Sequence, residues 1–272
     1  MNKLENVLKK QPRRWIMNLV FAIAMILALL YSFKGSSINL LRLQTVGIQF
    51  RLMLRGFSEI NWNFLIGTGL YDFDEGIIYL ALQTLSIAFT GTLIGSILAI
   101  PFAFLSSKKI VGKFSKIGIT LITFIRVFPE IILVLILVKG FGMTPLACVI
   151  TIGLHSIGML GKMFSEAIDN MDDGPIEALD AVGANTWQKI RYGIFPQITP
   201  DLSSIALYRL DINVRSASIL GIVGTTAGGF GAILSLAALF VDWRTLAAVL
   251  VVIVVLVLTV DAISSFLRRK LV

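Results

Sequence analysis

The sequence predicts an all-α integral membrane protein with about six transmembrane helices. Hydrophobic residues make up 56% of the 272-residue chain and charged residues only 15%, whereas about a quarter of a soluble domain is charged. Mean hydropathy is +0.87, and several apolar runs reach the roughly 20 residues that a helix needs to span a bilayer. Basic residues gather beside the ends of these runs, where they orient membrane proteins, so the net charge of +8 does not indicate nucleic-acid binding.

The apolar runs place the predicted spans in order along the chain. They cover residues 16–33, 77–105, 117–138, 145–164, 201–223 and 246–267. The first run follows a basic start, as in a signal peptide, but no small-residue cleavage pattern follows it, so we expect a retained helix. We therefore assign residues 1–75 to an N-terminal transmembrane helix plus an extracellular segment, 76–267 to a transmembrane core and 268–272 to a basic tail.

Loop charge predicts the orientation. The loop after the second span has four basic residues and no acidic one, and three more basic residues close the chain, which favours the cytoplasm for both. The residues are Lys108, Lys109, Lys113, Lys116, Arg268, Arg269 and Lys270. With six spans, both termini lie on this basic side. We expect a multi-pass protein of the inner (cytoplasmic) membrane with cytoplasmic N- and C-termini.

Small residues in the second span predict a close helix–helix contact. Gly91, Gly95, Ser96 and Ala99 are spaced so that a neighbouring helix can approach closely. Pro101 is expected to kink this span or to mark its last turn.

Residues 172–196 form a long polar insert between the fourth and fifth spans, and local signals predict two short helices in it. Asp173 is placed to cap the first helix, and Pro175 lies near its start, where a missing N–H group is harmless. Gly183 fits the left-handed position that ends this helix.

The second helix of the insert has its own start and stop signals. Asn185 or Thr186 is placed to cap it, and Pro196 is expected to break it. A capped two-helix segment at a membrane surface is typical of a docking element for another protein.

The chain does not have the residues of an enzyme. His155 is the only histidine and Cys148 the only cysteine, so we expect no metal site and no cofactor within one chain. His155 falls in the fourth span, where a hydrogen bond between helices is the favoured role. No phosphate-binding loop and no nucleophile elbow are present.

Ionisable residues inside the spans are candidates for function, because charge within a bilayer is costly. Arg126 and Glu130 are four residues apart and are predicted to share one face of a helix, either as an ion pair or as the lining of a pathway. Arg209 and Asp211 are expected nearer the cytoplasmic end of the fifth span, in contact with solvent.

Arg215 is the strongest candidate for contact with a solute. Asn213 and Ser216 lie beside it in the fifth span, deeper than Arg209. An arginine with nearby polar groups offers charge-assisted hydrogen bonds to an anionic group. We therefore expect Arg215 to line a pathway.

The polar insert resembles the EAA loop of bacterial ABC importer permeases. The match comprises Glu177-Ala178-Leu179, then Gly183, then Gly193-Ile194-Phe195-Pro196, at the spacing of that loop. Leu179, Gly193 and Phe195 replace the alanine, isoleucine and leucine of the general pattern. Three other stretches of the chain resemble sequence blocks of the phosphonate-type branch of the family. They are Arg126-Val127-Phe128-Pro129-Glu130, residues 155–162 and residues 213–221.

The resemblance implies a type I ABC importer permease fold with a cytoplasmic coupling loop that docks in a separate ATPase. The residues that it assigns to coupling are Glu177, Ala178, Gly183, Trp187 and Pro196. Trp187 and Ile190 are expected to anchor the second helix to the membrane domain. The candidate pathway residues are Arg126, Glu130, Asn213, Arg215 and Ser216. The implied partners are two ATPase subunits, an extracellular or periplasmic binding protein and a second permease chain, expected to form a homodimer.

The same resemblance implies transport of phosphonate or a related oxyanion such as phosphite or phosphate. An ABC permease for an amino acid or another small solute is the first alternative, because the same loop serves many solutes. An ion-coupled secondary transporter is a second, but it would need a carboxylate relay within the membrane, and Glu130 is the one convincing deep carboxylate. A membrane-embedded enzyme is a third.

Overall fold

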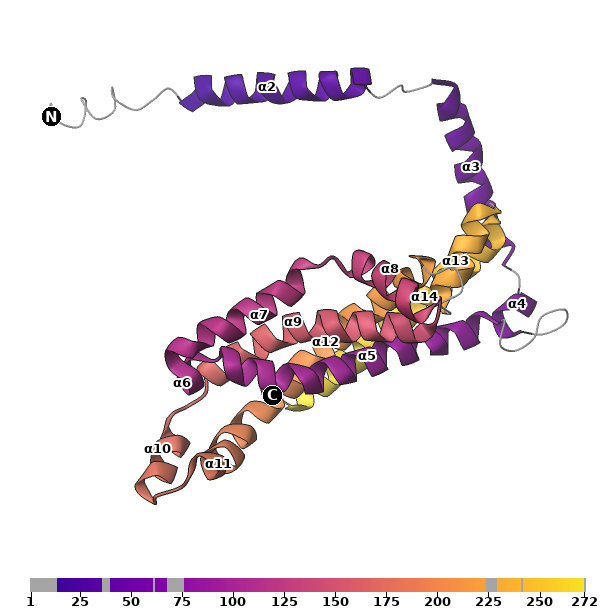
Figure 1. The fold of residues 1–272 in the computed structure, drawn as a ribbon. Coiled ribbons are helices and arrows are strands. Elements are labelled where there is room, and N and C mark those ends of the chain that lie inside the picture. The colour runs from indigo at the N-terminus through magenta and orange to yellow at the C-terminus, as the bar shows by residue number, and fades with distance from the viewer. Residues whose placement is uncertain are drawn as a thin grey trace, which may run out of the picture. The chain divides into compact units, whose positions relative to one another are not determined.

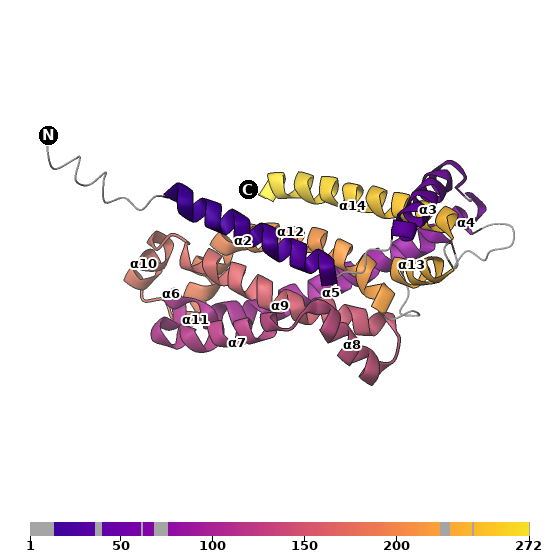
Figure 2. The ribbon, with the colours of Figure 1, turned by 90° about the horizontal axis from the view of Figure 1, so that it is seen from above.

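The computed structural model describes residues 14–35, 40–60, 62–67, 76–223, 229–240 and 242–271, and every regular element in these ranges is a helix (Figures 1 and 2). This confirms the all-α class. The chain divides into two compact units, Met1–Leu52 and Met53–Val272. The predicted boundaries at residues 75 and 267 stay a prediction.

The first unit contains a helix that is long and apolar enough to span a membrane. Helix α2 (Arg14–Gly35) has 22 residues and is therefore about 33 Å long, enough to cross a bilayer. The window Trp15–Ser32 is 0% buried in the structure although it is strongly apolar. A helix that is apolar all round and exposed is suited to lipid. Helix α3 (Leu40–Ser58) follows it in the chain, within the segment predicted to be extracellular.

Two long helices form the centre of the second unit, α5 (Ile77–Ser106) and α9 (Pro145–Asp169). Their backbones meet at the small residues that predicted a close contact. A Cβ atom added at Gly91 would lie 2.8 Å from the side chain of Ile152, and one added at Gly95 would lie 2.6 Å from that of Ser156. Only glycine fits there, so the predicted contact is confirmed.

The third predicted span is broken, and the expectation of one helix over residues 117–138 is wrong. Helix α7 (Ser115–Val127) ends before Phe128 and Pro129, and α8 (Glu130–Phe141) then leaves at an angle of 79°. Phe128 has an extended backbone, with φ −75° and ψ 119°. The ring of the following proline disfavours the helical conformation at this position, which explains the break.

The polar insert folds into short helical pieces that run directly into the next span. These are α10 (Gly174–Ala181), α11 (Thr186–Gln188) and the π-helical segment η3 (Lys189–Ile194), followed by α12 (Phe195–Val223). The expectation that Pro196 breaks the helix is wrong, because it lies in the first turn of α12. The π-helical turn directly before Pro196 changes the hydrogen-bond spacing where the proline lacks an N–H group.

Up to five of the expected spans are long and apolar enough in the described residues, and a sixth has the required length. Among the described residues, α2, α5, α9 and α14 are each long and apolar enough to cross a membrane, and the bent segment that includes α7 and α8 makes a fifth crossing. Helix α12 has 29 residues, about 44 Å, and is long enough for a sixth. Of these spans, α14 covers Trp243–Leu271, and the remaining helices of the described chain are α4 (Trp62–Ile66), α6 (Lys108–Val111), η2 (Gly112–Phe114) and α13 (Phe230–Leu239).

The apolar core continues from the bundle into the polar insert. One buried cluster joins α5, α9, η3 and α12 through residues such as Ala99, Phe164, Ile194 and Ile198. Ile176 of α10 and Ile190 of η3 pack against this cluster. The insert is therefore seated on the end of the bundle.

Candidate functional site

The coupling element (residues 172–196) is a sharp turn built from local signals. At the end of α10 the N–H of Gly183 donates to the carbonyl of Asp180, and the N–H of Ala184 donates to that of Leu179. This pair of bonds satisfies the last carbonyls of the helix and requires a left-handed residue at its centre. Gly183 supplies it with a φ of +75°, as predicted.

The second half of the coupling element starts with a reciprocal cap. The Asn185 side chain accepts from the N–H of Gln188 at 2.9 Å, and the Gln188 side chain accepts from the N–H of Asn185 at 2.8 Å. The predicted cap at Asn185 is thus confirmed, and Thr186 is the first residue of α11. Two backbone N–H groups at the start of the helix, which have no partner within the helix, are thus hydrogen-bonded.

The side chains at the tip of the coupling element are exposed on the surface of the protein. Glu177, Ala178 and Gly183 are exposed, Val182 is 79% exposed and Trp187 is 67% exposed. The expectation that Trp187 anchors the second helix to the membrane domain is wrong, because its ring has turned outward. Ile190 does pack inward, against the core cluster described above. A polar element that exposes a tryptophan and a valine has the properties of a protein-binding surface.

Lys109, in the short helix α6 that directly follows α5, binds the coupling element. Its ammonium group lies 2.6 Å from the carboxylate of Asp173 and 2.5 Å from the carbonyl of Met171. Next to it, Asp169 accepts from the hydroxyl of Ser107 at 2.5 Å and from the N–H of Lys109 at 3.1 Å. Asp173 was expected to cap α10 with its side chain, but no such bond forms because the carboxylate pairs with Lys109.

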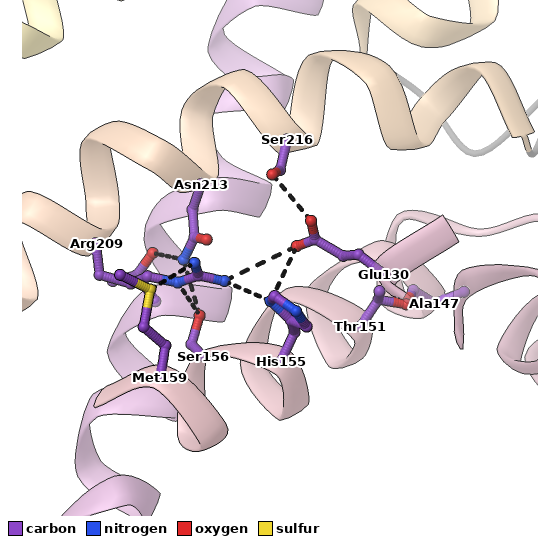
Figure 3. Close-up of polar contacts among 10 residues, drawn as sticks. Glu130, Ala147, Thr151, His155, Ser156, Met159, Arg209, Asn213 and Ser216 are labelled. Carbon is purple, nitrogen blue, oxygen red and sulfur yellow. Dashed lines mark hydrogen bonds and ion pairs between the residues drawn. The ribbon is translucent and has the colours of Figure 1, made fainter. Parts of the chain in front are cut away.

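A buried polar network lies inside the bundle (Figure 3). Its members come from α5, α8, α9 and α12 and are Thr92, Glu130, His155, Ser156, Met159, Arg209, Asn213 and Ser216. Arg209 donates from Nε to the Ser156 hydroxyl at 3.1 Å, and its Nη2 lies 2.8 Å from Nδ1 of His155. Since arginine can only donate, His155 accepts through Nδ1. The expected role of His155 in bonding between helices is confirmed.

Asn213 ties three helices together within this network. Its Nδ2 donates to Thr92 on α5 at 2.7 Å and to Ser156 on α9 at 2.9 Å. Asn213 is 0% exposed, so it lines no open path in this conformation. It positions helices instead.

Glu130 joins the network from the first residue of α8. Its Oε2 accepts from the Ser216 hydroxyl at 3.0 Å, and its Oε1 lies 3.9 Å from His155 Nδ1 and 4.0 Å from Arg209 Nη2. The predicted pair with Arg126 is wrong, because the break at Pro129 puts the two residues on different helices. Glu130 fastens the broken half-span to α9 and α12.

Arg209 and Asp211 were expected in solvent, and this is also wrong. They are 3% and 5% exposed. Asp211 pairs with Arg215, whose side chain is 53% exposed. A signal for Arg209 was present in the sequence, because residues 209, 213 and 216 form a polar stripe at helical spacing on α12. Its partners on α9 were not evident from that stripe.

Comparison with known proteins identifies the family of this chain. Residues 91–272 match the family described as "Binding-protein-dependent transport system inner membrane component", which covers more than half of the chain. The chain belongs to this family. It is therefore an inner-membrane permease subunit of an ABC importer, and it works with a separate ATPase and a binding protein. The permease itself is not an enzyme.

Curated relatives of this permease carry names from phosphorus transport. The phosphite transport system permease protein PtxC of Stutzerimonas stutzeri is 35% identical over 69% of this chain and 68% of that protein. The putative phosphite transport system permease protein HtxC of the same organism is 32% identical over 81% and 79%. The putative cryptic phosphonate transport system permease protein PhnE2 of Escherichia coli (strain K12) is 40% identical over 44% and 96%.

Solved structures of ABC importers share the fold. An inward-facing form of the MetNI methionine ABC transporter aligns with a TM-score of 0.62 at 21% identity, over 72% of this chain and 96% of that one. A bacterial transporter involved in the import of alginate aligns with a TM-score of 0.61 at 16% identity, over 95% and 99%. The predicted type I importer permease fold is confirmed.

Proposed function

We propose that this permease imports a phosphorus oxyanion: phosphonate, phosphite or phosphate. The main support is that two relatives named for phosphite transport are 35% and 32% identical to this chain. Each alignment covers about two thirds or more of this chain and of the relative. Arg215 fits such a solute, because its half-exposed guanidinium can form charge-assisted hydrogen bonds with an oxyanion.

The working assembly that we propose contains two identical permease chains and two ATPase subunits, with the pathway between the permeases. Exposed apolar side chains on the broken span support this arrangement. Ile131, Ile132, Leu135 and Ile136 all lie exposed on α8. We propose that both termini lie in the cytoplasm with the coupling element, because the basic residues Arg268, Arg269 and Lys270 end α14.

Coupling is proposed to occur at the exposed tip. Glu177 would pair with a basic residue of the ATPase, while Ala178 and Gly183 let its backbone approach closely. Trp187 would fill a pocket on the ATPase, in keeping with its exposed ring. Pro196, in the first turn of α12, lies where the coupling element passes into the membrane helix.

The pathway residues divide into two groups by exposure. Arg126 and Arg215 are exposed and are proposed to attract the anion. Glu130 and Ser216 are proposed to hold the half-span α8 against α9 and α12, because Glu130 contacts Ser216 and His155. Asn213 is proposed to hold α12 against α5 and α9. When ATP draws the coupling elements together, rigid movement of α12 would move α8 with it through the Ser216–Glu130 bond. This links nucleotide state to alternating access.

Reconstitution with the partner ATPase and binding protein tests the proposal. We expect ATP hydrolysis to be stimulated by binding protein loaded with methylphosphonate, phosphite or phosphate. Methionine is the control solute, because a probable D-methionine permease of Haemophilus influenzae is a weaker relative at 25% identity. Stimulation by methionine and by none of the three phosphorus anions would contradict the proposed substrate.

A further inference from the structure

A cavity outside the buried network lies between the end of α5, α7 and α9. Its volume is about 280 Å³, and Lys108, Arg126 and Lys162 are its basic lining residues. It lies at the coupling-element end of the bundle, since Lys108 directly precedes the lysine that pairs with Asp173. Thr123 and Ser165 add hydroxyl groups to its wall.

The acidic residues of the cavity are already engaged. Glu166 lies 3.6 Å from the ammonium group of Lys162, one helical turn away. Asp169 accepts from the Ser107 hydroxyl and from the N–H of Lys109. Within the described part of the chain, Lys108 and Arg126 have no acidic group within 4.0 Å. The cavity therefore has uncompensated positive charge.

A buried hydroxyl in the wall has no partner. Ser106 lines the cavity and is 2% exposed, and its Oγ makes no hydrogen bond in the described structure. Buried polar groups are normally bonded, so an unbonded hydroxyl in the wall of a cavity that is also lined by two unpaired cations indicates a ligand that accepts hydrogen bonds. An oxyanion meets that description.

The apolar part of the wall narrows the class of ligand. Ile119 and Ile122 of α7 line the cavity, and α7 also carries exposed apolar side chains at Ile117, Leu121 and Phe124. Basic pockets between transmembrane helices near the cytoplasmic surface suit anionic lipid headgroups. A free phosphate group presents the same acceptor oxygens.

We propose that this cavity binds a phosphate-type oxyanion, carried by an anionic phospholipid or present as free phosphate. Arg126 lies in the last turn of α7, directly before the break at Phe128 and Pro129. A bound anion would hold that turn against α9, where the stem of Arg126 already packs on Gly158. The cavity shares Arg126 with the proposed pathway, but its assignment also rests on Lys108 and Ser106, which are not among the proposed pathway residues.

Binding to the permease–ATPase complex tests the proposal in two arms. In neutral phosphatidylcholine nanodiscs, equilibrium binding of radiolabelled inorganic phosphate reports a free anion. In complex purified from membranes that contain phosphatidylglycerol, native mass spectrometry reports retained lipid. The site is probed by the double variant Lys108→Gln with Arg126→Gln. Lys113→Gln with Lys116→Gln is the matched control, because it removes two exposed lysines outside the cavity.

We expect one ligand to bind saturably and the double variant to bind it about thirtyfold more weakly, while the control stays within about twofold of wild type. Variant-sensitive binding in the first arm identifies free phosphate, and in the second arm it identifies lipid. Equal losses in variant and control would show general charge attraction and overturn the proposal, as would no variant-sensitive binding in either arm. Where the double variant fails to co-purify with the ATPase, Ser106→Ala replaces it. Weaker binding then supports the site, and wild-type binding overturns it.

Discussion

The coupling element and the buried polar network are built in opposite ways. Bonds that shape the coupling element join residues three to five positions apart, such as Gly183 with Asp180 and Ala184 with Leu179. Hydrogen bonds of the network join residues 50 to 121 positions apart, such as Arg209 with Met159 and Asn213 with Thr92. The first region exposes its side chains, and the second holds them buried or half-buried between helices. Substitutions in the coupling element should therefore reduce coupling, whereas substitutions in the network should reduce stability.

The largest effect is expected from Arg209→Ala in the network. Removal of a buried cation leaves Glu130, His155 and Ser156 without their shared partner, which should lower the free energy of unfolding by about 3 kcal/mol. Denaturant titration in detergent measures this. The matched control is Arg244→Ala, whose exposed pair with Glu59 should be worth less than about 1 kcal/mol. Equal destabilisation by both variants would refute the structural role of the network.

Gly183→Ala should give the next largest effect, in the coupling element. No atom lies within 4 Å of the added Cβ, so the change acts through the left-handed backbone and should strain the turn by about 1–2 kcal/mol. We expect solute uptake to fall about tenfold at a normal membrane level. Gly183→Asn should retain more uptake, because asparagine tolerates this conformation.

Gly174→Ala is the matched control for that variant. Gly174 starts α10 in the same element, its φ is not positive, and an added Cβ would make only ordinary contacts. Uptake should stay near wild type. If both glycine variants lose uptake equally, the left-handed turn is not the cause.

Arg215 can be tested separately from its ion pair. Arg215→Ala removes a candidate solute contact, but it also leaves the buried carboxylate of Asp211 unpaired. The double variant Asp211→Asn with Arg215→Ala removes that second effect. If Arg215 binds the anion, uptake should stay severalfold reduced in the double variant. Recovery of uptake to the wild-type rate would assign Arg215 to neutralising Asp211.

The smallest effect is expected from Lys109→Gln, at the connection between the coupling element and α5. Its bonds to Asp173 and Met171 are partly exposed, so stability should change by less than about 1 kcal/mol. We expect the ratio of solute transported to ATP hydrolysed to fall severalfold, because α5 no longer follows the insert. Lys113→Gln, which removes an exposed lysine of the same loop, should leave the ratio unchanged.

Membrane class, the approximate number of spans and the shape of the coupling element follow from the amino acids alone. Apolar runs of sufficient length need a bilayer, and the Gly183 turn and the Asn185 cap are each decided within a few neighbouring residues. The break at Pro129 had a signal too, because proline restricts the residue before it.

The tertiary structure determines which residues contact the charged side chains of the spans. Spacing along one helix suggested Arg126 for Glu130, but the bend of 79° separates them and turns Glu130 towards His155, Arg209 and Ser216. Periodicity describes which residues share a face of one helix and contains no information on which helices meet. The buried position of Arg209 and the outward turn of Trp187 both depend on how α9, α12 and η3 pack, so they emerged with the tertiary structure.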